Sequence, residues 1–113
     1  MADFTHFNQF GEAVMVDVGD KKETAREAVA EGRITMSSEC FQKVLEGTMK
    51  KGDVLGVASI AGIMGAKKTS ELIPLCHILN LTNVEIRFEP DEPACAFNAV
   101  CTVRTVGKTG VEM

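Results

Sequence analysis

The sequence from residue 84 to residue 103 reads VEIRFEPDEPACAFNAVCTV, and its alternation of apolar and polar side chains indicates the fold class. A segment with two prolines, residues 90–93, separates two runs in which every second residue is apolar. These apolar positions are Val84, Ile86 and Phe88 before the prolines and Cys95, Phe97, Ala99, Cys101 and Val103 after them. A period of two is typical of strands with one buried face, so the stretch predicts an antiparallel β-hairpin that turns at residues 90–93.

A second alternating segment lies upstream, from Ala28 to Met36, with apolar or small residues on one side and mostly charged residues on the other. Helix propensity alone favours a helix over residues 23–31. The alternation favours a strand, and we therefore expect a strand over Ala28–Met36. A further short run that favours β-structure, Val14–Val18, precedes both.

The region between the strands predicts two helices. Ser37 or Ser38 can cap the first, which carries Phe41 and Val44 at helical spacing and ends near residues 47–50.

Two helices cannot cover a sheet of three or four strands, and layered domains do not normally leave an apolar sheet face open. We therefore expect an α+β domain whose covering element is absent from residues 1–113 or is supplied by another chain.

The second helix is expected to begin at Asp53, a candidate N-cap, and to end near Lys67. Its large apolar residues form one stripe, at Val57, Ile60, Ala61 and Met64. Small residues recur at every third position beside this stripe, at Gly56, Ser59, Gly62 and Gly65. Because small residues allow a close approach of another backbone, we expect this helix to be buried against a sheet or a partner subunit.

Composition excludes several classes of protein. The chain has 113 residues, enough for a single domain with a real core. A net charge of −4, with no Trp or Tyr, argues against a nucleic-acid module. The longest apolar run, Val54–Ala66, is too short to span a bilayer, and the N-terminus lacks the pattern of a signal peptide. We therefore expect a cytoplasmic protein with neither a nucleic-acid nor a membrane partner.

The four cysteines are expected to be reduced and mostly buried. The sequence lacks the CxxC pairs that are typical of a zinc site, and it lacks the export signal that would favour disulfides. The sequence therefore predicts no metal.

Two short segments suggest phosphate binding. Lys50 and Lys51 precede the N-terminus of the second helix, where backbone N–H groups favour an anion. The alternative is a solvated loop with an Asp cap. Gly107-Lys108-Thr109 resembles the tail of a phosphate-binding P-loop, but the required first glycine is replaced by Thr102. A plain turn after the strand explains this second segment better.

His77 lies in the apolar stretch 73–79. It is either a hydrogen-bonded core residue or a group that gives and takes a proton near neutral pH. The neighbouring Cys76 has a thiol that could act as a nucleophile, but no second histidine lies nearby in the sequence to activate it.

The most specific segment of the chain is AKKTSELIPLCH, residues 66–77. Together with MVDV at 15–18, AREA at 25–28, IAGI at 60–63 and TVGKTGVEM at 105–113, it resembles the cyclic pyranopterin monophosphate synthase family, the protein C family of molybdenum cofactor biosynthesis. The resemblance covers nearly the whole chain. It implies a ferredoxin-like α+β fold, with an antiparallel sheet and helices on one face. It also implies a hexamer, built as a trimer of dimers, with active sites between subunits.

The implied reaction converts (8S)-3′,8-cyclo-7,8-dihydroguanosine 5′-triphosphate into cyclic pyranopterin monophosphate and releases diphosphate, with no cofactor. Carried over by position, Leu75, Cys76 and His77 hold the base and sugar of this small-molecule substrate, with Glu112 and Met113 opposite.

The resemblance also implies catalytic roles for Lys51 and His77. Lys51 acts either as a catalytic acid or base or as a phosphate-binding group, and these alternatives stay open. Arg26 and Lys67 are secondary candidates for the site.

The chain departs from the family pattern in two places. Ile78 follows the histidine where the family usually has proline, which affects a pocket wall. Family members also continue after the Gly-Val-Glu-Met segment into a long helix with an active-site aspartate and, three positions on, a lysine. Residues 1–113 are therefore expected to form an incomplete domain with little or no activity alone. The rival interpretation is a non-catalytic phosphate-ligand binding or assembly module of the same fold.

Overall fold

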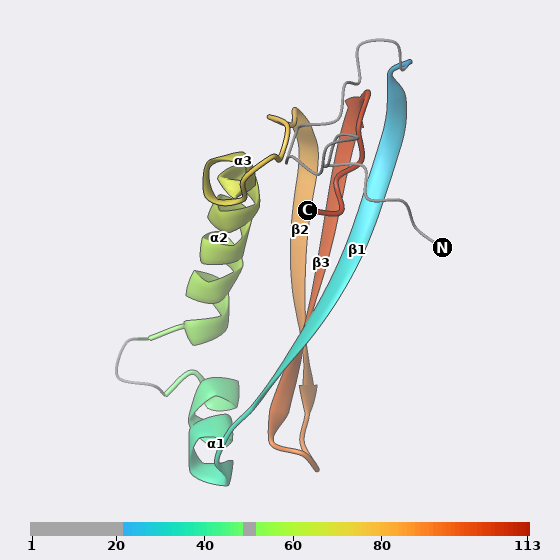
Figure 1. Ribbon diagram of the computed structural model, residues 1–113. Coiled ribbons are helices and arrows are strands. Elements are labelled where there is room, and N and C mark those ends of the chain that lie inside the picture. The colour runs from blue at the N-terminus through green and yellow to red at the C-terminus, as the bar shows by residue number, and fades with distance from the viewer. Residues whose placement is uncertain (1–21, 49–51) are drawn as a thin grey trace, which may run out of the picture.

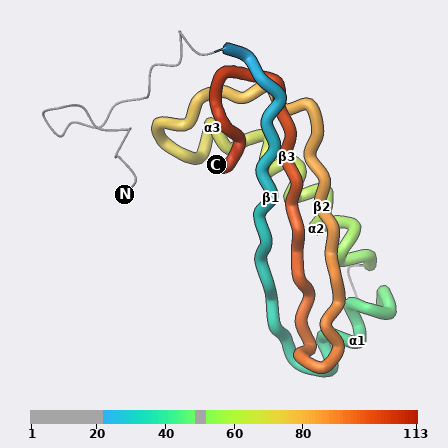
Figure 2. The backbone as a smooth tube through the Cα atoms, turned by 90° about the vertical axis from the view of Figure 1, so that its right-hand side faces the viewer, coloured from blue at the N-terminus to red at the C-terminus, as the bar shows by residue number. Residues whose placement is uncertain are grey.

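The computed structural model describes residues 22–48 and 52–113. Within these residues the chain forms, in order, β1 (Thr24–Thr35), α1 (Ser38–Glu46), α2 (Val54–Lys67), α3 (Thr69–Leu72), β2 (Leu81–Asp91) and β3 (Ala96–Gly107). The strands form one antiparallel sheet in the order β1-β3-β2, and the helices lie on one face of it (Figures 1 and 2). This confirms the predicted α+β class and is compatible with a ferredoxin-like fold. The expected strand Val14–Val18 lies outside the described residues.

The predicted hairpin is confirmed, with β2 and β3 in antiparallel register. Val84 pairs with Val103, and Ile86 pairs with Cys101, so the apolar positions of both strands share one face. The turn lies later than the predicted residues 90–93, because β2 continues to Asp91 and the turn occupies residues 92–95. Cys95, expected in the return strand, therefore lies in this turn with φ 51°.

The predicted upstream strand is also confirmed, and it begins earlier than the alternation indicated. β1 pairs with β3 along its whole length, from Thr24 opposite Gly107 to Thr35 opposite Ala96. Pairing with a strand of equal length provides hydrogen-bond partners for the backbone N–H and C=O groups of β1 that point towards β3. This gain outweighs the weak helix propensity of residues 23–31. On the polar face, Arg33 contacts Asp91 at 2.8 Å.

Helix α1 begins and ends at the predicted caps. The Ser37 hydroxyl accepts a hydrogen bond from the Cys40 backbone N–H at 3.1 Å, and Gly47 ends the helix with φ 71°. Phe41 and Val44 are buried against Phe97 of β3, and the two phenyl rings lie 4.9 Å apart. The best-packed core therefore lies at the α1 end of the molecule.

Helix α2 has the predicted N-cap, since the Asp53 carboxylate accepts from the Gly56 N–H at 2.9 Å. The expectation that this helix packs against the sheet is confirmed by its contacts with β2. None of its residues is fully buried, however, and its large apolar stripe is exposed. The exposed fractions are 62% for Val57, 61% for Ile60 and 51% for Met64.

Small residues decide which face of α2 meets the sheet. Gly62 lies so close to β2 that a Cβ at this position would overlap the Ile86 side chain. The small-residue face can approach the sheet most closely, so the large side chains are left on the opposite side. None of the described helices is long and apolar enough to cross a membrane.

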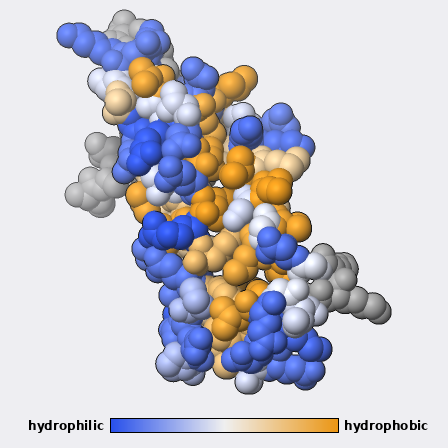
Figure 3. Space-filling model, turned by 180° about the vertical axis from the view of Figure 1, so that it is seen from behind, coloured by the Kyte–Doolittle hydropathy of each residue, from blue (hydrophilic) through white to orange (hydrophobic). Residues whose placement is uncertain are grey.

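The helices do not cover the whole apolar face of the sheet. α2 packs on β2, whereas β1 lies at the other edge, and Ile34 of β1 is 61% exposed. Figure 3 shows apolar side chains gathered in a band along the length of the molecule, with polar side chains on both sides. The predicted open sheet surface is therefore present in the described part of the chain.

Candidate functional site

Two segments distant in the sequence meet beyond the C-terminal end of α2. One is the loop that follows α3, and the other is the segment that follows β3. Between them lies a cavity of about 50 Å³. Its lining includes all five residues expected to contact the substrate, namely Leu75, Cys76, His77, Glu112 and Met113. The cavity is also lined by Leu79, Thr109 and Gly110, none of which was expected to contact the substrate although they lie in or beside the quoted motifs.

The backbone of Leu75 sets the course of the first segment. Its φ of 64° lies in the left-handed region, which L-residues with a side chain seldom adopt. Such conformations persist only where the surrounding structure holds them, and they are frequent at functional sites. The chain reverses here, and Cys76 and His77 follow at the cavity wall. The Cys76 thiol donates to the His77 carbonyl at 3.4 Å, an interaction that requires the protonated thiol.

The second segment is held by a buried residue just before its two candidate site residues. Val111 is buried, whereas Glu112 and Met113 are exposed at the cavity. The Glu112 carboxylate lies directly over Gly110, so closely that a Cβ on Gly110 would overlap Oε2. Glycine at position 110 therefore leaves the space that this carboxylate occupies.

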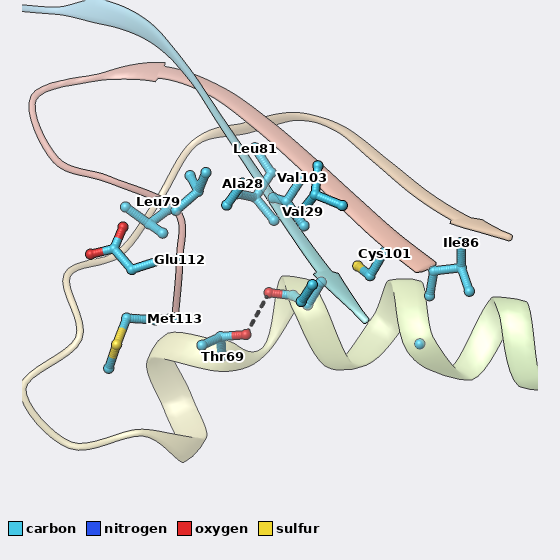
Figure 4. A pocket seen from close by; sticks show the side chains of 14 residues that line it. Ala28, Val29, Thr69, Leu79, Leu81, Ile86, Cys101, Val103, Glu112 and Met113 are labelled. Carbon is cyan, nitrogen blue, oxygen red and sulfur yellow. Dashed lines mark hydrogen bonds between the residues drawn. The ribbon is translucent and has the colours of Figure 1, made fainter. Parts of the chain in front are cut away.

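Glu112 and Met113 also border a larger apolar groove of about 430 Å³ between α2 and the open part of the sheet. Figure 4 shows both residues at the end of the groove where Thr69 and Leu79 lie. The Thr69 hydroxyl is bonded to the end of α2, at 2.9 Å from the Ala66 carbonyl oxygen. Only the tertiary arrangement creates this groove, so no local sequence signal predicted it.

His77 borders a second, more polar pocket of about 430 Å³ on the other side of its loop. This pocket is lined by Asn80, Thr105 and Lys108 among others, and the Thr105 hydroxyl donates to the Asn80 carbonyl. A third, small pocket connects His77 to the exposed Lys67 at the end of α2. His77 thus contributes to the lining of three cavities, which suits a residue that exchanges protons with a bound molecule.

The other two candidates have separate outcomes. Lys51 lies outside the described residues, and Asp53, two positions further along the sequence, is the N-cap of α2. The 14 residues of α2 span about 21 Å, and His77 lies beyond the opposite end. Arg26 does not line the small cavity, but its guanidinium donates to the Gly107 carbonyl at 3.2 Å.

Metal ligands are not grouped in the described parts of the chain. Within residues 22–48 and 52–113, no group of three or more His, Cys, Asp or Glu side chains is arranged to hold a metal ion. The four cysteines are all free thiols.

The described residues form an α+β protein with a candidate small-molecule site at one end of an antiparallel sheet. A sequence profile of the MoaC family matches residues 15–113. The chain is 54% identical over 111 residues to a cyclic pyranopterin monophosphate synthase of Chloroflexus aurantiacus, covering 98% of this chain and 68% of that protein. It therefore belongs to the MoaC family.

Two further relatives carry the same name. The protein from Syntrophomonas wolfei is 54% identical over 110 residues, covering 97% of this chain and 70% of the relative. The protein from Clostridium acetobutylicum is 48% identical over 110 residues, covering 97% and 68% respectively. The chain thus spans about two thirds of the length of these curated relatives.

Proposed function

We propose that this protein is a lyase of molybdenum cofactor biosynthesis. It converts (8S)-3′,8-cyclo-7,8-dihydroguanosine 5′-triphosphate into cyclic pyranopterin monophosphate and releases diphosphate. Family membership supports the reaction, and one structural observation supports the site. The two segments at 75–77 and 112–113, separated by more than thirty positions in the sequence, line one cavity.

The chemistry of this reaction requires two kinds of group. Departure of diphosphate builds negative charge on oxygen, which fixed cations stabilise. Ring opening and rearrangement require proton donors and acceptors that work near neutral pH. We assign proton transfer to His77, because this residue lines three cavities. We assign Lys51 to acid–base catalysis or phosphate binding, and Leu75, Cys76, Glu112 and Met113 to holding the substrate.

We further propose that the active protein is a hexamer, a trimer of dimers, with each site shared between protomers. The outward-facing stripe of α2 at Val57, Ile60 and Met64 supports a protein partner on that face, since large exposed apolar patches mark interaction sites. The length of α2, about 21 Å, supports sharing, because it separates the N-cap Asp53, which follows Lys51 by two positions in the sequence, from the His77 loop. The free thiols are consistent with a reducing compartment, and we propose the cytoplasm.

The test uses a full-length protein that contains this chain and measures its conversion of the cyclic triphosphate. We expect His77→Ala and Lys51→Ala each to lower kcat/KM by about a hundredfold or more, because each removes an acid–base or charge-stabilising group. Lys43→Ala is the matched control, since Lys43 is a surface lysine of α1 paired with Glu39. Wild-type rates in both site variants would refute the site, and binding without conversion by the wild type would indicate a non-catalytic module.

A further inference from the structure

We infer that Arg26 is a positioning residue for this site, one that holds the end of β3 and so places Glu112 and Met113 against the Leu75–His77 segment. The inference rests on the proposed function, since it concerns how the same site is assembled. Arg26 acts through the backbone of residues 107 and 108, not by lining the cavity itself.

The hydrogen bonds of Arg26 differ from those of the other arginines. Arg33, Arg87 and Arg104 each pair with a carboxylate on the polar face of the sheet. The Arg26 guanidinium instead donates from Nε to the Gly107 carbonyl at 3.2 Å and from Nη2 to the Lys108 carbonyl at 3.4 Å. Among the described residues it forms no ion pair, so its planar fork of donors is directed at two successive backbone carbonyls.

These carbonyls lie at the point where the chain leaves the sheet. The last pair of the β1–β3 ladder joins Thr24 to Gly107, and no strand continues from residue 108. The Gly107 carbonyl lies in this last pair and the Lys108 carbonyl lies just beyond it, and Arg26 donates to both from the same strand that pairs with β3. The bonds span 81 and 82 positions in the sequence, so they tie the exit of β3 to the start of β1.

The position of this exit determines where the site residues fall. Only residues 108–111 separate Gly107 from Glu112, and Val111 is buried at the end of that short connection. With Gly107 held by Arg26 and Val111 held by packing, the chain between them has little freedom. Glu112 then reaches the cavity that His77 lines. Without the guanidinium, we expect the connection to sample other paths and the Glu112 carboxylate to leave its place over Gly110.

A double-mutant cycle in the full-length protein tests this role through KM and kcat for the cyclic triphosphate. We expect Arg26→Ala to raise KM about five- to thirtyfold, the range that corresponds to one or two weak charge-assisted hydrogen bonds. We expect a smaller change in kcat. Arg26→Ala combined with Glu112→Ala should raise KM by less than the product of the two single effects, because Arg26 acts in part through Glu112.

Arg33→Ala is the matched control, because Arg33 also makes two hydrogen bonds from β1, to Asn98 and Asp91. It lies seven positions further along the strand, about 23 Å away. It should leave KM unchanged. Arg26→Lys keeps the charge but not the fork of donors, and should give a KM between those of the wild type and Arg26→Ala. This variant also replaces Arg26→Ala in the cycle if the alanine variant does not fold.

Three outcomes would overturn the inference while the wild type turns over normally. Effects of Arg26→Ala and Glu112→Ala that multiply independently would mean that Arg26 does not act through Glu112. An equal rise of KM in Arg33→Ala would mean a general loss of sheet stability. An unchanged KM in Arg26→Ala would mean no role at all. A wild-type protein that does not convert the substrate would instead overturn the proposed function, and with it this inference.

Discussion

The two ends of the sheet differ in how they are packed. At the α1 end, Phe41 and Phe97 are fully buried with their rings in contact. At the opposite end, the loop at 73–80 and the segment at 108–113 enclose cavities, and most of their side chains are partly or fully exposed. One end therefore stabilises the fold, and the other keeps polar and reactive groups accessible at some cost in packing. This division predicts which substitutions change stability and which change ligand binding.

The largest effect on stability is expected from Phe41→Ala. Phe41 is fully buried in the best-packed part of the molecule, and removing its ring leaves a cavity against Phe97. We expect the free energy of unfolding to fall by about 3–5 kcal/mol, measured by urea denaturation. Leu72→Ala is the comparison from the site end, where the side chain is exposed, and should cost well under 1 kcal/mol. Similar losses at both positions would contradict the proposed division.

The next effect is expected on binding, from Gly110→Ala. A Cβ at this position overlaps the Glu112 carboxylate, which can move aside because it ends a flexible side chain. We therefore expect little loss of stability but an affinity for the cyclic triphosphate about five- to thirtyfold weaker, measured by calorimetry on the full-length protein. Gly32→Ala, in open space on β1, is the control and should bind normally. Unchanged affinity in Gly110→Ala would show that the position of this carboxylate does not matter for binding.

A pair of glycines on α2 sharpens the comparison further. Gly65 has open space around it, so Gly65→Ala should stabilise the protein by about 0.8–1 kcal/mol through helix propensity. Gly62→Ala gains the same propensity but drives a Cβ into Ile86, and overpacking of this kind typically costs about 1–3 kcal/mol. Thermal unfolding of the two variants should therefore give opposite signs. A stabilised Gly62→Ala would mean that α2 is free to move away from β2.

The smallest effect concerns pH, on the polar face of the sheet near its α1 end. A hydrogen bond from Arg33 holds the pKa of Asp91 below its usual value, with the charge of Arg33 acting in the same direction. A lowered pKa in the folded state stabilises the protein above the pKa of the unfolded chain, and this contribution is lost as the pH falls through the folded pKa. Arg33→Ala should return the pKa of Asp91 towards its usual value, as followed by NMR titration. An unmoved pKa would contradict the pairing.

Much of the fold could be predicted because its signals are local. The period-two hairpin, the Ser37 and Asp53 caps and Gly47 at the end of α1 each depend on residues close together in the sequence. The orientation of α2 could not be predicted. Its pattern separates a large-residue face from a small-residue face, but which of them meets the sheet depends on how closely Gly62 approaches Ile86.

The site divides in the same way. Cys76 and His77 could be named because they lie in a long and specific segment, whereas Glu112 could be named only because its weaker segment occurs together with that one. Their meeting in one cavity depends on the β1–β3 register and on the left-handed backbone of Leu75, neither of which leaves a local pattern. The role inferred for Arg26 depends on contacts 81 positions away in the sequence, so it became visible only in the structure.

The central place of β3 has a consequence for motion. Its backbone groups form hydrogen bonds with β1 on one side and with β2 on the other. Within the described residues, each outer strand is hydrogen-bonded to a neighbouring strand on one side. In a deuterium-exchange experiment, amides in the middle of β3 should therefore be the last to exchange. The segment that carries Glu112 begins where this strand ends, so we expect one wall of the cavity to be joined to the slowest-exchanging strand. The opposite wall belongs to the loop with His77, which is not part of the sheet and should exchange faster.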